Sequence, residues 1–333
     1  MIQKSYQASE NRYNGVMQYK RAGRSGIILP RISLGLWQNF GAETPFAKSR
    51  EIILHAFDKG IVSFDLANNY GVPYGSAEET LGRLMRSDLH PYRDELFIAT
   101  KAGYDMWDGP YGNWGSRKYL IASLNQSLRR MNLDYVDVFY IHRYDPETPL
   151  QETLQALVDI VRQGKALYVG ISRWGKDALS YAVDYLEAHD TPCLLFQNRL
   201  NIFDQSAITD GLLDFAESNG LGFMAFSTLA EGLLTGKYID GIPHGSRADK
   251  GSHLTKNHIT PEIIAKIKKL GIIAAERGES LARMSAAWVL SQRGVTSIIA
   301  GCSATSQLDE SISALDSPAF TKEQLDQINS AIK

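Results

Sequence analysis

Short runs of β-branched and aromatic residues recur along the chain, separated by stretches whose apolar positions repeat with helical spacing. Runs of this kind are typical of buried parallel strands, because strands covered on both faces lose the alternation of polar and apolar residues. We expect eight such strands, at residues 32–36, 62–65, 96–101, 135–141, 166–171, 193–197, 221–226 and 297–300.

The stretches between these strands predict helices. In residues 153–163, the apolar side chains of Leu154, Leu157, Val158 and Val161 form one stripe of an amphipathic helix. One strand and one helix in an interval of about 30 residues or more make a βα unit. Eight successive units favour an α/β fold closed as a (β/α)8 TIM barrel over an open sheet. Ahead of the barrel, residues 16–19 and 26–29 flank a glycine-containing turn and predict a β-hairpin.

The interval before the last strand is much longer than the others. It holds a segment rich in Gly, His and Lys, residues 240–258, followed by helical patterns over 261–277 and 281–292. A segment of this kind between strands is typical of a lid or a binding loop. Because the sequence contains no linker and no internal repeat, we expect residues 1–333 to form a single domain.

Composition narrows the classes of function. The chain of 333 residues is 44% hydrophobic with a formal net charge of -2, which argues against nucleic acid or an anionic membrane as a partner. No apolar stretch approaches the roughly 18 residues that cross a bilayer, and residues 1–7 lack the apolar centre of a signal peptide. We therefore expect a cytoplasmic protein. Cys193 and Cys302 stand alone, which predicts neither a disulfide framework nor a metal site.

Four polar residues follow successive predicted strands. Asp65 and Lys101 close their strands, Tyr70 lies in the turn after Asp65, and His142 follows the next strand. Since α/β barrels carry their chemistry at the C-terminal ends of the strands, these are candidate catalytic residues. A carboxylate beside a buried lysine keeps that lysine charged, and the cation would in turn lower the pKa of a neighbouring phenol. Taken one at a time, each is more typical of a strand cap, but four such residues at successive strand ends favour a catalytic group.

Other candidates have two interpretations each. Phe226 suits either stacking on a flat ligand or core packing, and Lys237 and Arg247 suit either a diphosphate or a solvated surface. Ser303 precedes a predicted helix over 304–315, where it would cap the helix or bind phosphate. The loop after Lys101 contains four aromatic residues, which form either a pocket wall or a separate cluster. These are Tyr104, Trp107, Tyr111 and Trp114.

The motifs FDLANNYG (64–71), TKAG (100–103), GISRW (170–174) and GCS (301–303) resemble those of the aldo-keto reductase superfamily, and the resemblance covers nearly the whole chain. Within it the chain is similar to the bacterial glyceraldehyde-3-phosphate reductase group. It also resembles the β subunits of voltage-gated potassium channels, which share the tripeptide at 172–174.

The resemblance implies a catalytic tetrad of Asp65, Tyr70, Lys101 and His142, with His142 binding the substrate oxygen. It implies NADPH/NADP+ as cofactor, lying across the barrel mouth. The implied cofactor contacts are Trp37, Asp65, Ser172, Arg173, Gln197, Phe226, Ser227, Leu229, Lys237, Arg247, Gly301, Ser303, Gln307 and Glu310. The implied substrate contacts are Trp37, Tyr70, Trp107, His142 and Arg143, and a substrate phosphate would meet Arg143 or Arg117. The chain departs from the family at Arg173 and Ser311, where Asn is common.

The expected function is therefore NADPH-dependent reduction of a short-chain aldehyde, such as glyceraldehyde 3-phosphate or methylglyoxal, to its alcohol. The hydride would come from NADPH and the proton from Tyr70. The alternative is an NADP(H)-binding regulatory subunit of a membrane channel or other partner. His142 favours the enzyme, because the channel β subunits carry Asn there. The small-molecule aldehyde is the expected partner, and the resemblance leaves open whether the chain forms a homo-oligomer.

Overall fold

Eight parallel strands close into a barrel in the computed structural model, which describes residues 6–251 and 253–333. Around the barrel they are β3 (Ile32–Gly35), β4 (Ser63–Asp65), β5 (Phe97–Ala102), β6 (Val136–Ile141), β7 (Ala166–Ser172), β8 (Cys193–Arg199), β9 (Gly222–Phe226) and β10 (Val295–Ala300). Because β10 pairs with both β9 and β3, the sheet of the barrel closes on itself. The predicted (β/α)8 fold is confirmed, and each predicted strand overlaps an observed one.

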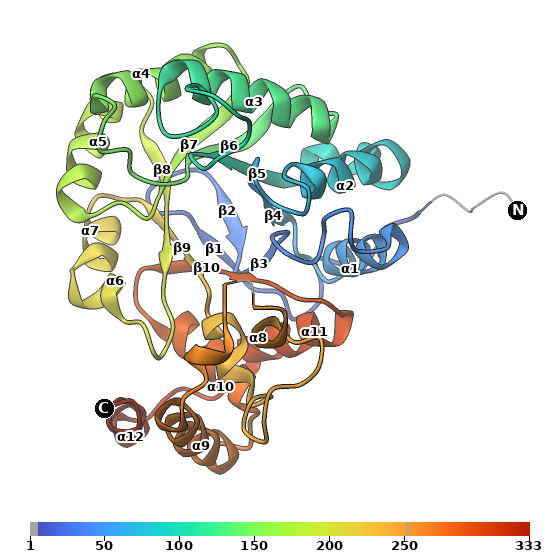
Figure 1. Cartoon of the computed structure of the whole chain (residues 1–333), viewed down its shortest axis with the longest axis vertical. Helices are drawn as coiled ribbons and strands as arrows, with labels where there is room; N and C mark the ends of the chain where they lie inside the picture. The colour runs from blue at the N-terminus through green and yellow to red at the C-terminus, as the bar shows by residue number, and fades with distance from the viewer. Residues whose placement is uncertain (1–5, 252) are drawn as a thin grey trace, which may run out of the picture.

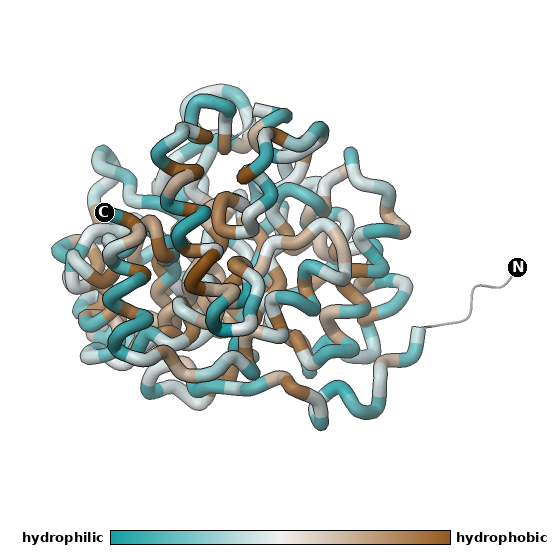
Figure 2. The backbone as a smooth tube through the Cα atoms, turned by 90° about the horizontal axis from the view of Figure 1, so that it is seen from below, coloured by the Kyte–Doolittle hydropathy of each residue, from teal (hydrophilic) through white to brown (hydrophobic). Residues whose placement is uncertain are grey.

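Helices surround the strands (Figure 1). The longer ones are α1 (Phe46–Asp58), α2 (Ser76–Leu84), α3 (Arg117–Met131), α4 (Leu150–Arg162), α5 (Lys176–Ala188), α7 (Leu212–Ser218), α9 (Pro261–Glu276), α10 (Leu281–Ser291), α11 (Thr305–Ser313) and α12 (Lys322–Ala331). The shorter ones are η1 (Met85–Leu89), η2 (His90–Glu95), α6 (Ser206–Thr209), η3 (Ala230–Thr235), α8 (Arg247–Lys250), η4 (Lys256–His258) and η5 (Ala314–Asp316). Helices α4, α9 and α10 match the predicted patterns to within three residues at each end. Figure 2 shows polar residues alternating with apolar ones along the outer segments, as amphipathic packing requires.

A hairpin of β1 (Tyr19–Arg21) and β2 (Ile28–Pro30) closes the N-terminal end of the barrel. Ala22 and Leu29 are fully buried in one cluster with barrel-lining side chains such as Met224. The turn comes so close to the barrel that a Cβ on Gly23 would lie 1.9 Å from the carbonyl oxygen of Gly220. The prediction began the hairpin too early, because the apolar Val16 and Met17 precede the first strand.

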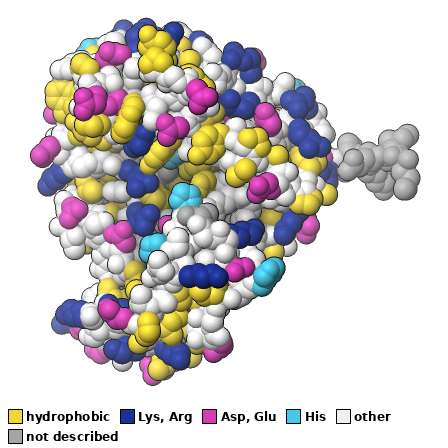
Figure 3. Space-filling model, in the orientation of Figure 1, with side chains coloured by type: hydrophobic (Ala, Val, Ile, Leu, Met, Phe, Trp, Pro, Cys, Tyr) yellow, Lys and Arg dark blue, Asp and Glu magenta, His cyan; other side chains and the backbone are white. Residues whose placement is uncertain are grey.

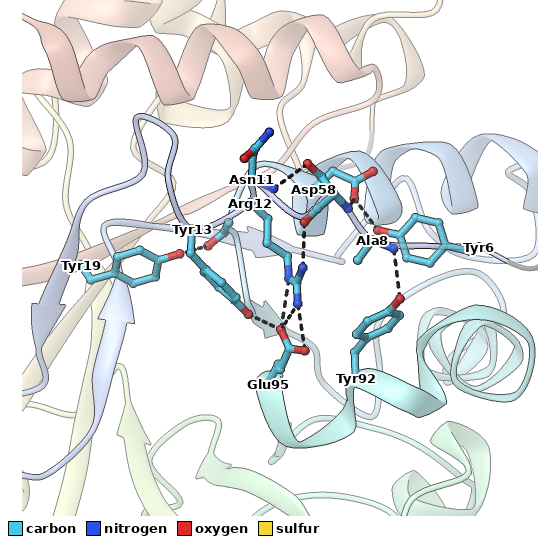
Figure 4. A network of polar contacts seen from close by, with 11 residues as sticks. Tyr6, Ala8, Asn11, Arg12, Tyr13, Tyr19, Asp58, Tyr92 and Glu95 are labelled. Atoms are coloured by element: carbon cyan, nitrogen blue, oxygen red, sulfur yellow. Dashed lines mark hydrogen bonds and ion pairs between the residues drawn. The ribbon is translucent and has the colours of Figure 1, made fainter.

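The segment ahead of the hairpin is tied to the barrel by a polar network (Figure 4). The hydroxyl of Tyr6 donates to Asp58 at the end of α1, with an O···O distance of 2.7 Å. The guanidinium of Arg12 pairs with Glu95 at the end of η2. The prediction for residues 1–7 falls partly on residues 1–5, which lie outside the described residues, as does residue 252 of the predicted binding loop.

All eight barrel strands run in the same direction, so their C-terminal ends meet at one mouth of the barrel. The loops that follow β4, β5, β6 and β7 therefore converge at this mouth. Over the described ranges, no helix is long and apolar enough to span a membrane.

Candidate active site

The four predicted catalytic residues lie together at the mouth. Asp65 ends β4, Lys101 is the penultimate residue of β5, and His142 directly follows β6. Tyr70 lies in the turn after β4, with its ring centroid 5.7 Å from that of His142. The parallel arrangement predicted from the sequence thus brings side chains from three strands into one group.

Lys101 is the centre of this group. Its ammonium donates to Oδ2 of Asp65 and to the carbonyl oxygen of Leu66, both at 2.6 Å, and to the hydroxyl of Tyr70 at 3.4 Å. The second oxygen of Asp65 accepts a hydrogen bond of 2.9 Å from the amide of Gln197. Because three acceptors surround the ammonium and two donors hold the carboxylate, the orientation of both side chains is fixed.

The electrostatics of Tyr70 differ from the prediction. Burial raises the pKa of its phenol well above 10, and the charge of Asp65 raises it further, whereas Arg173 opposes the change. The Lys101 ammonium, 3.4 Å from the hydroxyl, favours the phenolate, but burial and the Asp65 carboxylate outweigh it, so the pKa of Tyr70 is not lowered as expected. The phenol therefore stays protonated at neutral pH, which is the state that donates a proton.

His142 is a neutral imidazole in this setting. Burial lowers its pKa well below 6.5, and the nearby cations Lys101, Arg173 and Arg143 lower it further. The ring stands edge-on to Tyr104 as well as to Tyr70, with centroids 4.7 Å apart in the Tyr104 pair. A neutral imidazole donates through only one ring nitrogen, so His142 can offer a single N–H to a substrate oxygen.

The loop after β5 divides its aromatic residues between two places. Tyr104 lies against His142, whereas Trp107 packs on Tyr119 with a centroid distance of 5.2 Å. Trp114 covers the guanidinium of Arg143, whose Cζ is 3.7 Å from the ring centroid. Tyr111 is exposed. Trp107 therefore belongs to a separate aromatic cluster with Tyr119, whereas Tyr104 lies beside the catalytic group.

The two candidate arginines have different surroundings. Arg143 donates to the carbonyl oxygen of Gly103 and to the side chain of Asn113, both at 2.7 Å, at the mouth of the barrel. Arg117 begins α3 and is paired with Asp159 of α4 on the outer surface. Arg117 is the solvated helix start that the sequence favoured, and Arg143 remains the candidate for a substrate anion.

The long segment before α9 reaches back over the mouth. The guanidinium of Arg247 in α8 lies 5.4 Å from the ring centroid of Trp37, and the ring of His253 lies 4.7 Å from it. No sequence pattern singles out His253, because a histidine in a polar loop has no preferred partner. In Figure 3, basic and histidine side chains surround the middle of the face seen in Figure 1.

Several predicted cofactor residues lie on strands adjoining this group. The buried hydroxyl of Ser172 at the end of β7 has no hydrogen-bond partner within the described part of the chain. Phe226 ends β9, with Arg173 6.0 Å from its ring centroid. After β9, Ser227 and two further non-glycine residues take left-handed backbone angles, which is the kind of strain that clusters at ligand sites.

The loop after β10 and helix α11 hold further predicted cofactor residues. The backbone amide of Ser303 donates to the side-chain oxygen of Gln307 at 2.8 Å, and the Ser303 hydroxyl lies 3.2 Å from the same oxygen. Glu310 accepts a hydrogen bond from Ser280 of the neighbouring α10 region. Helix α11 has Ala304 as its N-cap, so Ser303 is not the predicted cap. The Ser303 donors lie two residues before Thr305, the first residue of the helix.

A model of the aldo/keto reductase family matches residues 31–333, which include all of these positions. The chain belongs to the aldo/keto reductase family. This aldo/keto reductase is 49% identical over 329 residues to a protein of Escherichia coli (strain K12) called L-glyceraldehyde 3-phosphate reductase, covering 98% of this chain and 95% of that one. It is 34% identical over 324 residues to a probable voltage-gated potassium channel subunit beta of Oryza sativa subsp. japonica, covering 95% and 97% of the two chains.

As a member of this family the protein is an oxidoreductase enzyme, and aldo/keto reductases use nicotinamide cofactors. The residues present fit such a group. The Ser172 hydroxyl, unpartnered among the described residues, suits a carboxamide, the face of Phe226 suits a flat ring, and the Lys237 ammonium suits phosphate oxygens. The Ser303 donors would have to leave Gln307 to bind a phosphate. Gln197 already donates one amide hydrogen to Asp65, so that hydrogen is not available to a ligand.

Proposed function

We propose that the protein reduces short-chain aldehydes, such as glyceraldehyde 3-phosphate or methylglyoxal, to alcohols with NADPH. The observation that carries this proposal is the linked group of Asp65, Lys101 and Tyr70 beside a neutral His142. It contains a protonated phenol, a fixed cation behind it and a separate N–H donor, which are the groups that carbonyl reduction requires.

The reaction divides between the cofactor and the chain. A bound reduced nicotinamide would supply the hydride for the carbonyl carbon. His142 and Tyr70 hold the carbonyl oxygen, and Tyr70 transfers its proton to that oxygen as the charge on it develops. The resulting phenolate is stabilised by the Lys101 ammonium, which lies 3.4 Å from the hydroxyl oxygen. Trp37, in contact with Arg247 and His253 of the segment before α9, would limit the access of water to the mouth.

We base the proposed substrate class on the 49% identical relative named L-glyceraldehyde 3-phosphate reductase. Arg143, held beside the pocket by Gly103 and Asn113, is the residue we assign to the substrate phosphate. The alternative of a cofactor-binding regulatory subunit draws on the relatives named as potassium channel subunits. His142 favours the enzyme, because an imidazole N–H is suited to a reacting carbonyl oxygen.

The test is an assay of NADPH oxidation by the purified protein with a panel of aldehydes, including both enantiomers of glyceraldehyde 3-phosphate. We expect turnover on at least one member of the panel and none without aldehyde. Tight binding of NADPH without turnover on any aldehyde would favour the regulatory alternative.

A further inference from the structure

Tyr104 lies against the catalytic group at the barrel mouth, although it is outside the predicted tetrad. It is the third residue after Lys101, and its ring meets that of His142 edge to face, at 86° with centroids 4.7 Å apart. Tyr70 meets the same imidazole at 72° and 5.7 Å. His142 is therefore in contact with two tyrosine rings, of which only Tyr70 has a role in the proposed reaction.

Contacts of the backbone and of the ring face hold Tyr104 in place, and its hydroxyl donates no hydrogen bond within the described part of the chain. Its backbone carbonyl accepts a hydrogen bond from the hydroxyl of Tyr119, which is itself bound by the amide of Asn68 at 3.0 Å. The guanidinium of Arg143 lies 4.3 Å from the centroid of the Tyr104 ring. These contacts fix the position from which the hydroxyl projects.

Among the described residues, the Tyr104 hydroxyl takes part in hydrogen bonding only as an acceptor. Its oxygen accepts a hydrogen bond of 3.2 Å from a guanidinium nitrogen of Arg173. A phenol both donates and accepts, and within residues 6–251 and 253–333 no protein group accepts the Tyr104 proton. A donor next to a cation and without an acceptor is suited to an oxygen atom of a bound molecule.

The neighbouring groups indicate which oxygen this is. In the proposed reaction Tyr70 and His142 hold the carbonyl oxygen, and Tyr104 contacts the same imidazole. The phenols of Tyr104 and Tyr70 are also close enough for Tyr104 to raise the pKa of Tyr70. An atom that meets the Tyr104 hydroxyl is therefore a near neighbour of the carbonyl group.

We propose that Tyr104 donates a hydrogen bond to an oxygen on the carbon next to the reacting carbonyl, and so selects aldehydes that are oxygenated at that carbon. This inference rests on the proposed reductase function. It makes Tyr104 a specificity-determining residue for hydroxyaldehydes and oxoaldehydes, distinct from the phosphate contact assigned to Arg143. No bond is formed or broken at Tyr104 in the reaction.

The test compares Tyr104→Phe with the wild type on three aldehydes of three carbons each. Propanal has no oxygen on the second carbon, glyceraldehyde has a hydroxyl and methylglyoxal has an oxo group. The variant keeps the ring against His142 and loses only the donor. We expect kcat/KM to fall about 10-fold for glyceraldehyde and methylglyoxal, and to stay within about twofold for propanal. Tyr111→Phe, in the exposed part of the same loop, is the matched control.

Each outcome decides between a selective and a supporting role. An equal loss on all three aldehydes means that Tyr104 only supports His142, and no loss on any means that its hydroxyl meets no substrate; either result overturns the proposal. The substrate preference of the wild-type protein is a second test, which does not depend on the variant. Propanal turned over as efficiently as glyceraldehyde also overturns the proposal, while the reductase function stands. If the wild-type protein reduces no aldehyde, both the role of Tyr104 and the proposed reductase function are overturned.

Discussion

The ammonium of Lys101 lies 2.6 Å from Oδ2 of Asp65, and the two side chains are 0% and 6% exposed. Removing one partner of such a pair leaves a buried charge without compensation. We therefore expect Asp65→Asn to lower the free energy of unfolding by about 3–5 kcal/mol, measured by urea denaturation. The double variant Asp65→Asn with Lys101→Met should recover part of this loss. A double variant that is no more stable than Asp65→Asn alone would show that the pair is not the source of the effect.

Tyr70→Phe should reduce kcat for aldehyde reduction by about 10²–10⁴ and leave the affinity for NADPH nearly unchanged. The variant removes the proton donor while the ring still fills the space beside His142. Stopped-flow or steady-state kinetics gives kcat, and fluorescence titration gives the affinity. Tyr74→Phe, whose ring is exposed in the same loop, is the control. Retention of more than about a tenth of wild-type kcat would remove Tyr70 from the acid role.

His142 should make the stability of the protein depend on pH below about 6.5. Its pKa is well below that value in the folded chain and close to it in the unfolded chain, so the unfolded state binds more protons as the pH falls. The stability that neutral His142 contributes is therefore complete above about pH 6.5 and is lost toward its folded pKa, at up to about 1.4 kcal/mol per pH unit.

Urea denaturation at pH 7 and pH 5 measures this dependence. The difference between the two pH values should be smaller in His142→Gln than in the wild type. His90→Gln alters an exposed histidine and should keep the wild-type difference. Equal slopes in all three proteins would mean that His142 is not a buried neutral group.

Arg143→Ala should narrow the preference for glyceraldehyde 3-phosphate over glyceraldehyde. A hydrogen bond to a charged group contributes about 1.5–3 kcal/mol, so the ratio of the two kcat/KM values should fall by roughly 10-fold or more. Arg117→Ala serves as the control, because that arginine is paired with Asp159 on the outer surface. Wild-type enzyme that treats both aldehydes equally would leave the phosphate contact without support.

The protein should bind NADPH more tightly than NADH, by roughly 10- to 150-fold for one charged hydrogen bond to the additional phosphate. Ser303→Ala should lower the affinity for NADPH while leaving that for NADH unchanged. Ser306→Ala, an exposed position of α11, is the matched control. Titration of both cofactors by fluorescence quenching measures the ratio. Affinities within about threefold of each other would show that these residues are only loop structure.

The sequence was sufficient to predict the barrel and to bring the four catalytic candidates together, because strand patterns are local and parallel strands align their ends. It was not sufficient for Tyr70, whose pKa depends on its burial in the folded barrel and on the charge of the nearby Asp65. The aromatic loop shows the same limit. Tyr104 and Trp107 are three residues apart in this loop. Only the folded chain shows that Tyr104 lies against His142 and that Trp107 lies against Tyr119.

The network around Asp58 and Glu95 also bears on where the protein can be cut. A fragment that begins at residue 31, where the family match starts, would lose the hydroxyl of Tyr6 and the guanidinium of Arg12. The carboxylate of Asp58 at the C-terminal end of α1 would then face the negative end of the helix dipole without that compensation. The same cut would remove Leu29 and so expose the barrel-lining side chains that it covers at the N-terminal end of the barrel. The shortest fragment that keeps the catalytic architecture intact therefore starts well before the first barrel strand.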